Sequence, residues 1–265
     1  MALLSRRSSP SPDEENPYWV SFSDLMSGLL IIFILAAVAL IIELTQKSLE
    51  WDAVLAAVAQ AENDRRSLVE EIEGKLQREG IPVFVDESKS VITIPESALQ
   101  FEQSRADIPE DARTRSIVTT IGAILLTTIE NDPRTQSLDT VFIEGHSDCL
   151  PYRGAAFDDN WDLSAKRSNK LWRYWTLTDD NGEAPPAAGL AALKNGDARP
   201  LFSVSGYGET RPLPGTRPDG ACAPERPELL SQNRRIDLRF TIKAPTEAYL
   251  ERLRATIQGS QRAED

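Results

Sequence analysis

The longest apolar stretch of the chain lies close to its N-terminus. From Leu25 to Ile42 the sequence runs for eighteen residues without a charged side chain, and Ser27 is the only strongly polar residue in it. A helix needs about 20 predominantly apolar residues to cross a bilayer, so this stretch is about long enough. The pattern therefore predicts one transmembrane helix over residues 17–44.

A cleaved signal peptide is the other interpretation of an apolar N-terminal stretch. The apolar region of a signal peptide is usually only about 7–15 residues long and ends at a small-x-small cleavage site, which this sequence lacks after Ile42. We therefore expect an uncleaved anchor. Arg6 and Arg7 precede the stretch and Lys47 is the only base shortly after it, which favours an N-terminus inside the cell and a C-terminal part outside. Residues 1–16, rich in Ser, Pro and acids, are expected to form a disordered cytoplasmic tail.

Residues 45–80 are predicted to form a linker or stalk helix that continues out of the membrane. Gly74 is the only glycine before Gly80, and Gly80 with Pro82 ends the pattern. Two interpretations stay open: an amphipathic helix that rests on its own domain, and the stalk of a dimer. Both rest on a seam whose positions step alternately by four and three, a heptad pattern with two charged interruptions: Trp51, Leu55, Val58, Glu62, Arg65, Val69, Ile72 and Leu76.

Beyond residue 80 the pattern alternates between short strands and helices. It predicts a hairpin over 83–94, helices over 111–130 and 161–178, and strands over 140–144, 201–206 and 235–243. Pro- and Gly-rich stretches at 179–198 and 207–232 are expected to be long loops, and 244–265 a C-terminal tail or short helix. The order predicts an α+β domain over 81–243, in which a mixed sheet carries its helices on one face.

Composition excludes several functional classes. The formal net charge is −12, so nucleic acid is not an expected partner. The chain has two cysteines, Cys149 and Cys222, and one histidine, His146, so a zinc site of the usual Cys/His type is not expected. The cysteines are either two buried thiols or one disulfide, and a disulfide is favoured if this part of the chain lies outside the cytoplasm.

An acid stands directly before the apolar stretch. Asp24 precedes Leu25, and holding a carboxylate at the edge of a spanning helix costs about 2–3 kcal/mol even on the mildest scale. Such a residue is a functional candidate by default. Ser23 and Ser27 beside it are possible oxygen ligands for an ion, although such residues are common in membrane helices.

Three polar segments of the outer domain suggest a binding groove. They are Glu144–Asp148 at a strand end, Asn160–Arg167 at a helix start, and Ser205–Glu209 with Asn233–Arg235 downstream. Asp148 and Arg167 can face one groove, where the acid would bind an ammonium and the arginine a carboxylate, as an amino-acid head group requires. The alternative is a plain salt bridge between Asp148 and Arg167. A hydrolase built on His146, Ser147 and Asp148 is not favoured, because neighbours in sequence do not make a triad.

The series G-H-S-D, N-W-D-L-S-A-K-R, G-Y-G-E and N-R-R-I-D resembles the OmpA C-terminal peptidoglycan-binding family over about residues 81–243. The resemblance implies binding of the diaminopimelate of the cell-wall peptide. Asp148 then matches the acid that holds the ligand's ammonium, and Arg167 the arginine that holds its carboxylate. Asn160 and Leu163 match adjoining pocket positions. Asn233 and Arg234 match the closing motif of the fold. Cys149 directly after the acid, and the long loops 179–198 and 207–232, depart from the family pattern.

The stretch Tyr18-Trp19-Val20-Ser21-Phe22-Ser23-Asp24-Leu25-Met26-Ser27-Gly28 resembles the start of the membrane helix of MotB-type stator subunits. The resemblance implies that Asp24 carries the translocated ion, with H⁺ favoured over Na⁺, and that no cofactor is needed. It implies a homodimer in the bacterial inner membrane, with a periplasmic outer domain and a multi-helix partner of the MotA or ZorA type. The subgroup that it resembles most is ZorB of the Zorya anti-phage systems. The alternatives are a flagellar MotB subunit and a passive peptidoglycan tether, and an enzyme is not expected.

Overall fold

A computed structural model of the chain describes residues 17–178, 182 and 184–243. The predicted tails, 1–16 and 244–265, therefore lie outside the described residues. By its internal contacts the chain divides into one unit that includes Met1–Val54 and a second unit of Leu55–Glu247. Each unit is described by itself.

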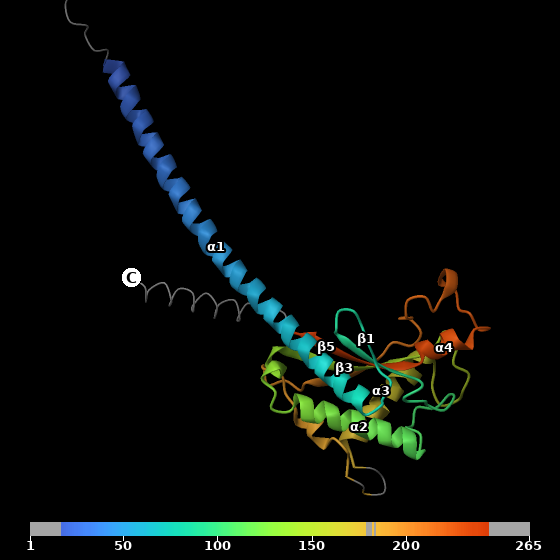
Figure 1. The fold of residues 1–265 in the computed structure, drawn as a ribbon. Helices are drawn as coiled ribbons and strands as arrows, with labels where there is room; N and C mark the ends of the chain where they lie inside the picture. Colours follow the sequence, from blue (N-terminus) through green and yellow to red (C-terminus); the bar gives the residue numbers. More distant parts are fainter. Residues whose placement is uncertain (1–16, 179–181, 183, 244–265) are drawn as a thin grey trace, which may run out of the picture. The chain divides into compact units, whose positions relative to one another are not determined.

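The first unit contains the start of α1, a continuous helix of 62 residues from Pro17 to Arg78 (Figure 1). Its apolar side chains are exposed, among them Leu29, Ile32 and Phe33. The most apolar 18-residue window of the helix has a mean hydropathy of 3.0. By length and composition this part of α1 can cross a membrane. The helix passes residue 44 without interruption, so the predicted membrane and linker helices are one element.

The last turns of α1 belong to the core of the second unit. Leu68, Ile72 and Leu76 are fully buried there, whereas Leu55 is 63% exposed. The C-terminal half of the heptad seam therefore rests on its own domain, as the first of the two interpretations expects. The compact unit begins at Leu55 and not at the predicted residue 81, because these turns supply part of its core.

The two charged interruptions of the seam are accounted for by the same packing. Arg65 is buried, and its guanidinium pairs with Glu62 and donates to the backbone oxygen of Ser88. Ser88 lies in the turn of the following hairpin. Arg65, held by its pair with Glu62, thus attaches the helix to the hairpin.

Five strands form one mixed sheet in the order β1-β2-β5-β3-β4. Strands β3 and β4 are parallel, and every other neighbouring pair is antiparallel. The predicted hairpin and the three later strands are confirmed within a few residues. The bounds are Phe84–Val85 for β1, Val91–Pro95 for β2, Leu138–His146 for β3, Phe202–Gly206 for β4 and Arg235–Ile242 for β5.

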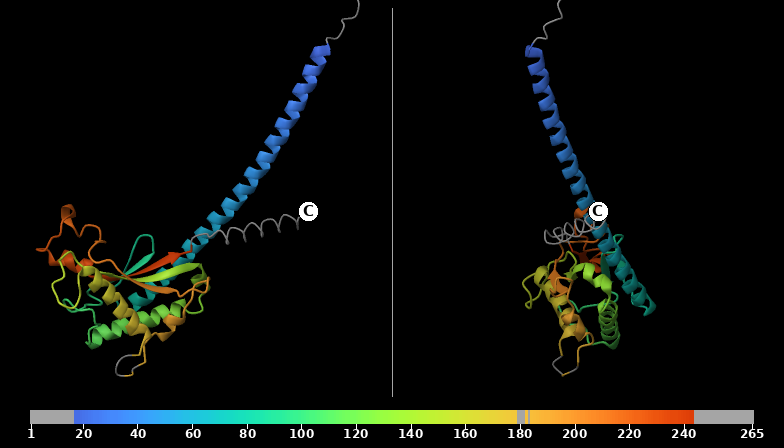
Figure 2. Two further views of the ribbon diagram at one scale, coloured as in Figure 1. Left: turned by 180° about the vertical axis from the view of Figure 1, so that it is seen from behind. Right: turned by 90° about the vertical axis from the view of Figure 1, so that its left-hand side faces the viewer.

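Two long helices cover one face of this sheet, which confirms the predicted α+β class. They are α2, Ala112–Ile129, and α3, Asn160–Thr176, and both views of Figure 2 place them on the same side. Asp111 and Asp159 cap their N-termini, because each side chain accepts a hydrogen bond from the backbone N–H three residues later in the chain. The end of α1 lies beside α2, where Lys75 Nζ donates to Thr128 Oγ1 at 2.9 Å.

The segments predicted as long loops contain short helices. Residues 207–232 include the 3₁₀ turn η3, Pro218–Gly220, and most of α4, Pro227–Asn233, while 179–198 includes η2, Ala188–Ala192. The prediction of an unstructured loop was wrong for α4. Pro227 stands at its first position, where proline is compatible with a helix because the missing N–H would have no partner there. A further 3₁₀ turn, η1, covers Pro133–Ser137.

The core lies between the sheet and the helices. Alternate residues of the strands face the helices, so that Ile143 and Leu238 are buried beside Leu125 and Trp175. Trp175 is fully buried, and its indole Nε1 donates to the backbone oxygen of Val118 at 2.8 Å. This hydrogen bond satisfies the one polar atom of the largest core side chain.

Two glycines allow α3 to lie directly on the strands. Gly145 and Gly206 are register partners on β3 and β4. A Cβ at Gly145 would lie 2.0 Å from the backbone oxygen of Ser164, and one at Gly206 would lie 2.3 Å from the backbone nitrogen of Ala165. No other residue fits at either position without moving the helix.

We expect Ile72→Ala to lower the free energy of unfolding of the outer domain by about 2–5 kcal/mol, because it leaves a cavity in a closed core. Leu55→Ala on the same helix should change it by less than about 0.5 kcal/mol. Chemical denaturation of the full chain in detergent, followed by tryptophan fluorescence, measures both. An equal loss in the two variants would contradict the assignment of the last turns of α1 to the core.

Candidate ligand-binding site

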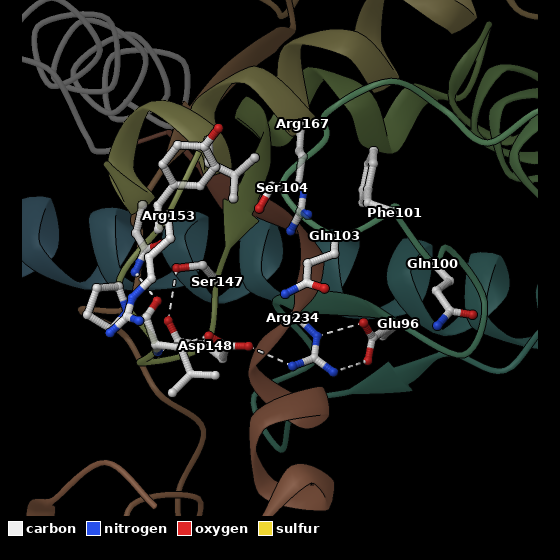
Figure 3. A pocket seen from close by; sticks show the side chains of 15 residues that line it. Glu96, Gln100, Phe101, Gln103, Ser104, Ser147, Asp148, Arg153, Arg167 and Arg234 are labelled. Atoms are coloured by element: carbon white, nitrogen blue, oxygen red, sulfur yellow. Dashed lines mark hydrogen bonds and ion pairs between the residues drawn. The ribbon is translucent and has the colours of Figure 1, made fainter. Parts of the chain in front are cut away.

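A cavity of about 630 Å³ opens where β3, α3 and the loop after β2 come together (Figure 3). All four predicted pocket residues line it: Asp148, Asn160, Leu163 and Arg167. Its other polar side chains include Glu96, Gln103, Ser147, Arg153 and Arg234. The cavity lies entirely within the second unit.

Asp148 follows the end of β3, and its two carboxylate oxygens have separate partners. Oδ1 accepts a hydrogen bond from the backbone N–H of Leu150 at 2.9 Å, and Oδ2 lies 2.6 Å from Nη1 of Arg234. The predicted alternative, a salt bridge from Asp148 to Arg167, is wrong, since Arg167 has no ion pair with any described residue. The partner of Asp148 is Arg234.

Arg234 links Asp148 to a second acid, Glu96. Its Nε and Nη2 atoms donate to the two oxygens of Glu96 at 2.6 and 2.7 Å (Figure 3). Both ion pairs raise the pKa of Arg234 above its usual value. Glu96 was not among the residues predicted from the sequence to line the pocket. The signal lay in the sheet register: Pro95 pairs with Arg235 in antiparallel strands, so Glu96 must lie beside Arg234.

Arg167 is held differently. Its side chain is buried, and its Nε and Nη2 donate to the backbone oxygens of Arg105 and Glu102 at 2.9 and 3.3 Å. The guanidinium also lies 4.9 Å above the ring of Phe101. Burial lowers the pKa of Arg167 to about 10, so the group stays charged at neutral pH. Nη1 has no hydrogen-bond acceptor among the described residues and is free for a ligand.

The other motif residues shape the cavity. Asn160 donates from Nδ2 to the backbone oxygen of Leu150 at 2.9 Å, which holds the loop after Asp148, and Leu163 adds an apolar wall. Asn233 lies outside the cavity lining. Its Oδ1 accepts from the backbone N–H of Leu213 at 2.8 Å, so it orders the loop before α4.

The cavity therefore offers both signs of charge. Asp148 and Glu96 supply carboxylates, while Arg153, Arg167 and Arg234 supply guanidinium groups. An ammonium can approach Asp148, and a carboxylate can accept from Nη1 of Arg167. Chemically, the arrangement suits a small zwitterionic group.

Cys149 and Cys222 form a disulfide whose Cα atoms are 5.7 Å apart. The bridge joins the residue after Asp148 to the loop between β4 and α4. It therefore restrains the cavity at its acidic end.

The opposite face of the sheet carries a buried layer of ion pairs. Glu144 binds Arg239 through both oxygens, and Asp237 binds Arg235 at 3.0 Å. His146 Nε2 lies 3.1 Å from Oδ2 of Asp237. Burial alone would raise the pKa of Asp237, but the nearby His146 and the charge of Arg235 lower it.

The donor atoms of Glu144, His146 and Asp237 lie within 4.8 Å of one another, a spacing that suits a metal ion. Both carboxylates, however, already have guanidinium partners that neutralise them. The cluster is thus a set of internal ion pairs beneath the site. Ser147 Oγ donates to the backbone oxygen of Asp148, and His146 faces Asp237, so the described geometry does not join His146 and Ser147 as base and nucleophile.

Asp24 lies in the first unit, on an exposed part of α1. One turn further, Ser27 Oγ donates to the backbone oxygen of Ser23 at 2.8 Å, a bond internal to the helix. The helix presents Asp24 and the apolar residues after it to its surroundings.

Comparison with known proteins gives these similarities. No family model matches the chain. An uncharacterised Bacillus subtilis protein, YtxE, is 24% identical over 152 residues, 57% of this chain, and the match spans about half (48%) of that relative.

Several solved structures are similar to the chain, including the three that follow. A MotB-like protein of Desulfovibrio vulgaris is 21% identical, covering 74% of this chain and 97% of that one, with a TM-score of 0.41. The periplasmic domain of Helicobacter pylori MotB is 16% identical over 68% and 91%, with a TM-score of 0.44. The cell wall anchor of the Pseudomonas aeruginosa type VI secretion system is 18% identical over 68% and 99%, with a TM-score of 0.42.

We expect reduction of the Cys149–Cys222 bond to lower the free energy of unfolding by about 4 kcal/mol, because it frees a segment with a sequence separation of 73 residues in the unfolded chain. Denaturation of the full chain with and without a reductant measures the change. The double variant C149S/C222S, insensitive to reductant, is the control. Two free thiols in a non-reducing mass measurement would refute the assignment.

Proposed function

We propose that the outer domain binds the diaminopimelate-containing peptide of peptidoglycan in the cavity around Asp148 and Arg167. The observation that carries the proposal is that an acid from the end of β3 and a guanidinium from α3 line one cavity with charges of opposite sign. Diaminopimelate carries an ammonium and a carboxylate on one carbon, so its binding needs both an acidic and a basic side chain. The four motifs that resemble the OmpA C-terminal family lie in and around this cavity.

In the proposed complex the ligand's ammonium binds Asp148 and its carboxylate accepts from Nη1 of Arg167. The carbonyl partners of Arg167 hold its guanidinium in place before the ligand arrives. Less side-chain entropy is then lost on binding. Asn160 supports this geometry through the loop at Leu150.

We propose further that the whole chain is the stator subunit of an ion-driven motor in a bacterial inner membrane. In this role Asp24 takes up and releases the ion, a proton in the first instance, as its access to water changes from one side of the membrane to the other. One charge crossing 100 mV releases about 2.3 kcal/mol. The wall-bound domain supplies the fixed point against which the force acts.

A single helix cannot enclose an ion path, so the proposal requires a multi-helix partner of the MotA or ZorA type and two copies of this chain. The lead-in Pro17–Met26 favours the Zorya anti-phage subgroup over a flagellar motor, because it lacks a basic, Gly-rich start. A passive wall tether is the competing function. It would need the cavity but no acid at Asp24.

The cavity is tested with Asp148→Asn and Arg167→Lys. Each should weaken binding of the full chain to purified peptidoglycan by about tenfold or more, because each removes one charge-assisted contact or its fork geometry. Sedimentation with insoluble peptidoglycan gives the bound fraction. Asp158→Asn and Arg78→Lys make the same chemical changes at exposed positions outside the cavity lining and should bind normally.

Unfolding curves of the same variants separate lost binding from lost structure. Unchanged binding by folded D148N and R167K would refute the proposed ligand site. Released soluble fragments after incubation with peptidoglycan would indicate cleavage and point to an enzyme.

Asp24→Asn should abolish ion flux through the complex with its membrane partner while co-purification with that partner persists, because the amide cannot release a proton. Asp52→Asn, further along the same helix and beyond the apolar stretch, is the matched control and should conduct normally. Proton flux into vesicles that contain the complex is the measurement. Full flux in D24N would favour the passive tether.

A further inference from the structure

A second cavity, of about 470 Å³, lies between α2 and α3. It shares no lining residue with the cavity around Asp148 and Arg167. We name it the α2–α3 cavity. Its basic side chains are Arg115 from α2 and Lys170 and Arg173 from α3. Asp107 is the only described acid in its lining. In a chain with a net charge of −12, a cavity with three bases and one acid is unusual.

The single acid does not neutralise the two arginines. Asp107 pairs with Lys170 at 2.5 Å. The hydrogen bond from Lys170 lowers the pKa of Asp107 most, and the positive charges of Lys170, Arg105 and Lys166 lower it further. Neither Arg115 nor Arg173 has a carboxylate within ion-pair distance among residues 17–178, 182 and 184–243. Two guanidinium charges in the lining, that of the partly buried Arg115 and that of the exposed Arg173, are therefore left without a counter-charge from the described chain.

Arg115 carries the clearest sign of a missing partner. Its Nε is buried and has no hydrogen-bond acceptor in the described part of the chain. A buried donor without a partner costs about 1–3 kcal/mol. Arg173 by itself needs no ligand, since it stands in the last turn of α3, where a positive charge offsets the helix dipole. That explanation does not apply to Arg115, which lies in the first turn of α2.

The remaining polar groups of the lining also include a spare donor. Thr119 Oγ1 and Tyr174 OH are 3.0 Å apart, so one hydroxyl donates to the other. The second hydroxyl hydrogen is left for another acceptor. Guanidinium forks and a hydroxyl are the donors that bind carboxylate and phosphate oxygens.

We propose that the α2–α3 cavity binds an oxyanion, a carboxylate or a phosphate, of the envelope material that the outer domain contacts. The inference deepens the proposed function and rests on it for the source of the anion. Arg167 and Arg173 are six residues apart on α3, which is about 9 Å along the helix axis and about 240° around it, so the two side chains leave different sides of the helix.

The test is titration calorimetry of the full chain in detergent with inorganic phosphate, with acetate and with soluble muropeptides, at constant ionic strength. The variant R115Q/R173Q should bind phosphate or acetate about tenfold more weakly or worse than the parent chain. R226Q/R78Q removes two arginines from outside both cavities and should bind as the parent does. Phosphate binding without acetate binding assigns the site to phosphate-bearing lipids or polymers, and the reverse assigns it to wall carboxylates.

Two further measurements keep the outcome decisive. R115Q should leave the unfolding midpoint unchanged or raise it, because it removes an unpaired buried donor, whereas a purely structural role would lower it. D148N should lose muropeptide binding at the first cavity and keep anion binding at the second, so the two proposals fail separately. Equal anion binding by R115Q/R173Q and R226Q/R78Q would overturn the inference.

Discussion

The close contact between α3 and two strands determines where the groups of the cavity around Asp148 and Arg167 lie. It depends on Gly145 and Gly206, which leave room for the backbone of Ser164 and Ala165. Two hydrogen bonds fix the helix there, from Ser168 Oγ to the oxygen of Ser205 and from the N–H of Gly208 to Ser164 Oγ. As a result the start of α3, with Arg167, lies beside the end of β3, where Asp148 emerges.

Charge in the outer domain is arranged on both sides of the sheet. On the face away from the helices, Glu144 and Asp237 form ion pairs with arginines, and these pairs have a structural role. In the cavity around Asp148 and Arg167, Arg234 bridges Glu96 and Asp148, which keeps two acids close without mutual repulsion. Arg167 is the only buried arginine of this lining that lacks a carboxylate partner among the described residues, since Arg153 is exposed. The group with unused hydrogen-bonding capacity is therefore the one proposed to contact the ligand.

Local patterns predicted the membrane helix, the strands and the two long helices, because apolar periodicity and caps such as Asp111 and Asp159 are local signals. The motif match found Asp148, Asn160, Leu163 and Arg167, and all four line one cavity. What escaped prediction depends on tertiary contacts. The Glu96–Arg234 pair follows from the register of β2 and β5. The burial of Ile72 follows from packing against the sheet domain, which a heptad pattern alone cannot distinguish from pairing with another helix.

The way Arg167 holds the loop after β2 has a consequence for how this domain can vary. Both of its acceptors are backbone oxygens, at Glu102 and Arg105, so the contact is indifferent to the side chains at those positions. The path of the loop is fixed while its sequence remains free to change. Substitutions at these two positions can therefore alter the outer rim of the cavity, while the guanidinium of Arg167 keeps the same position.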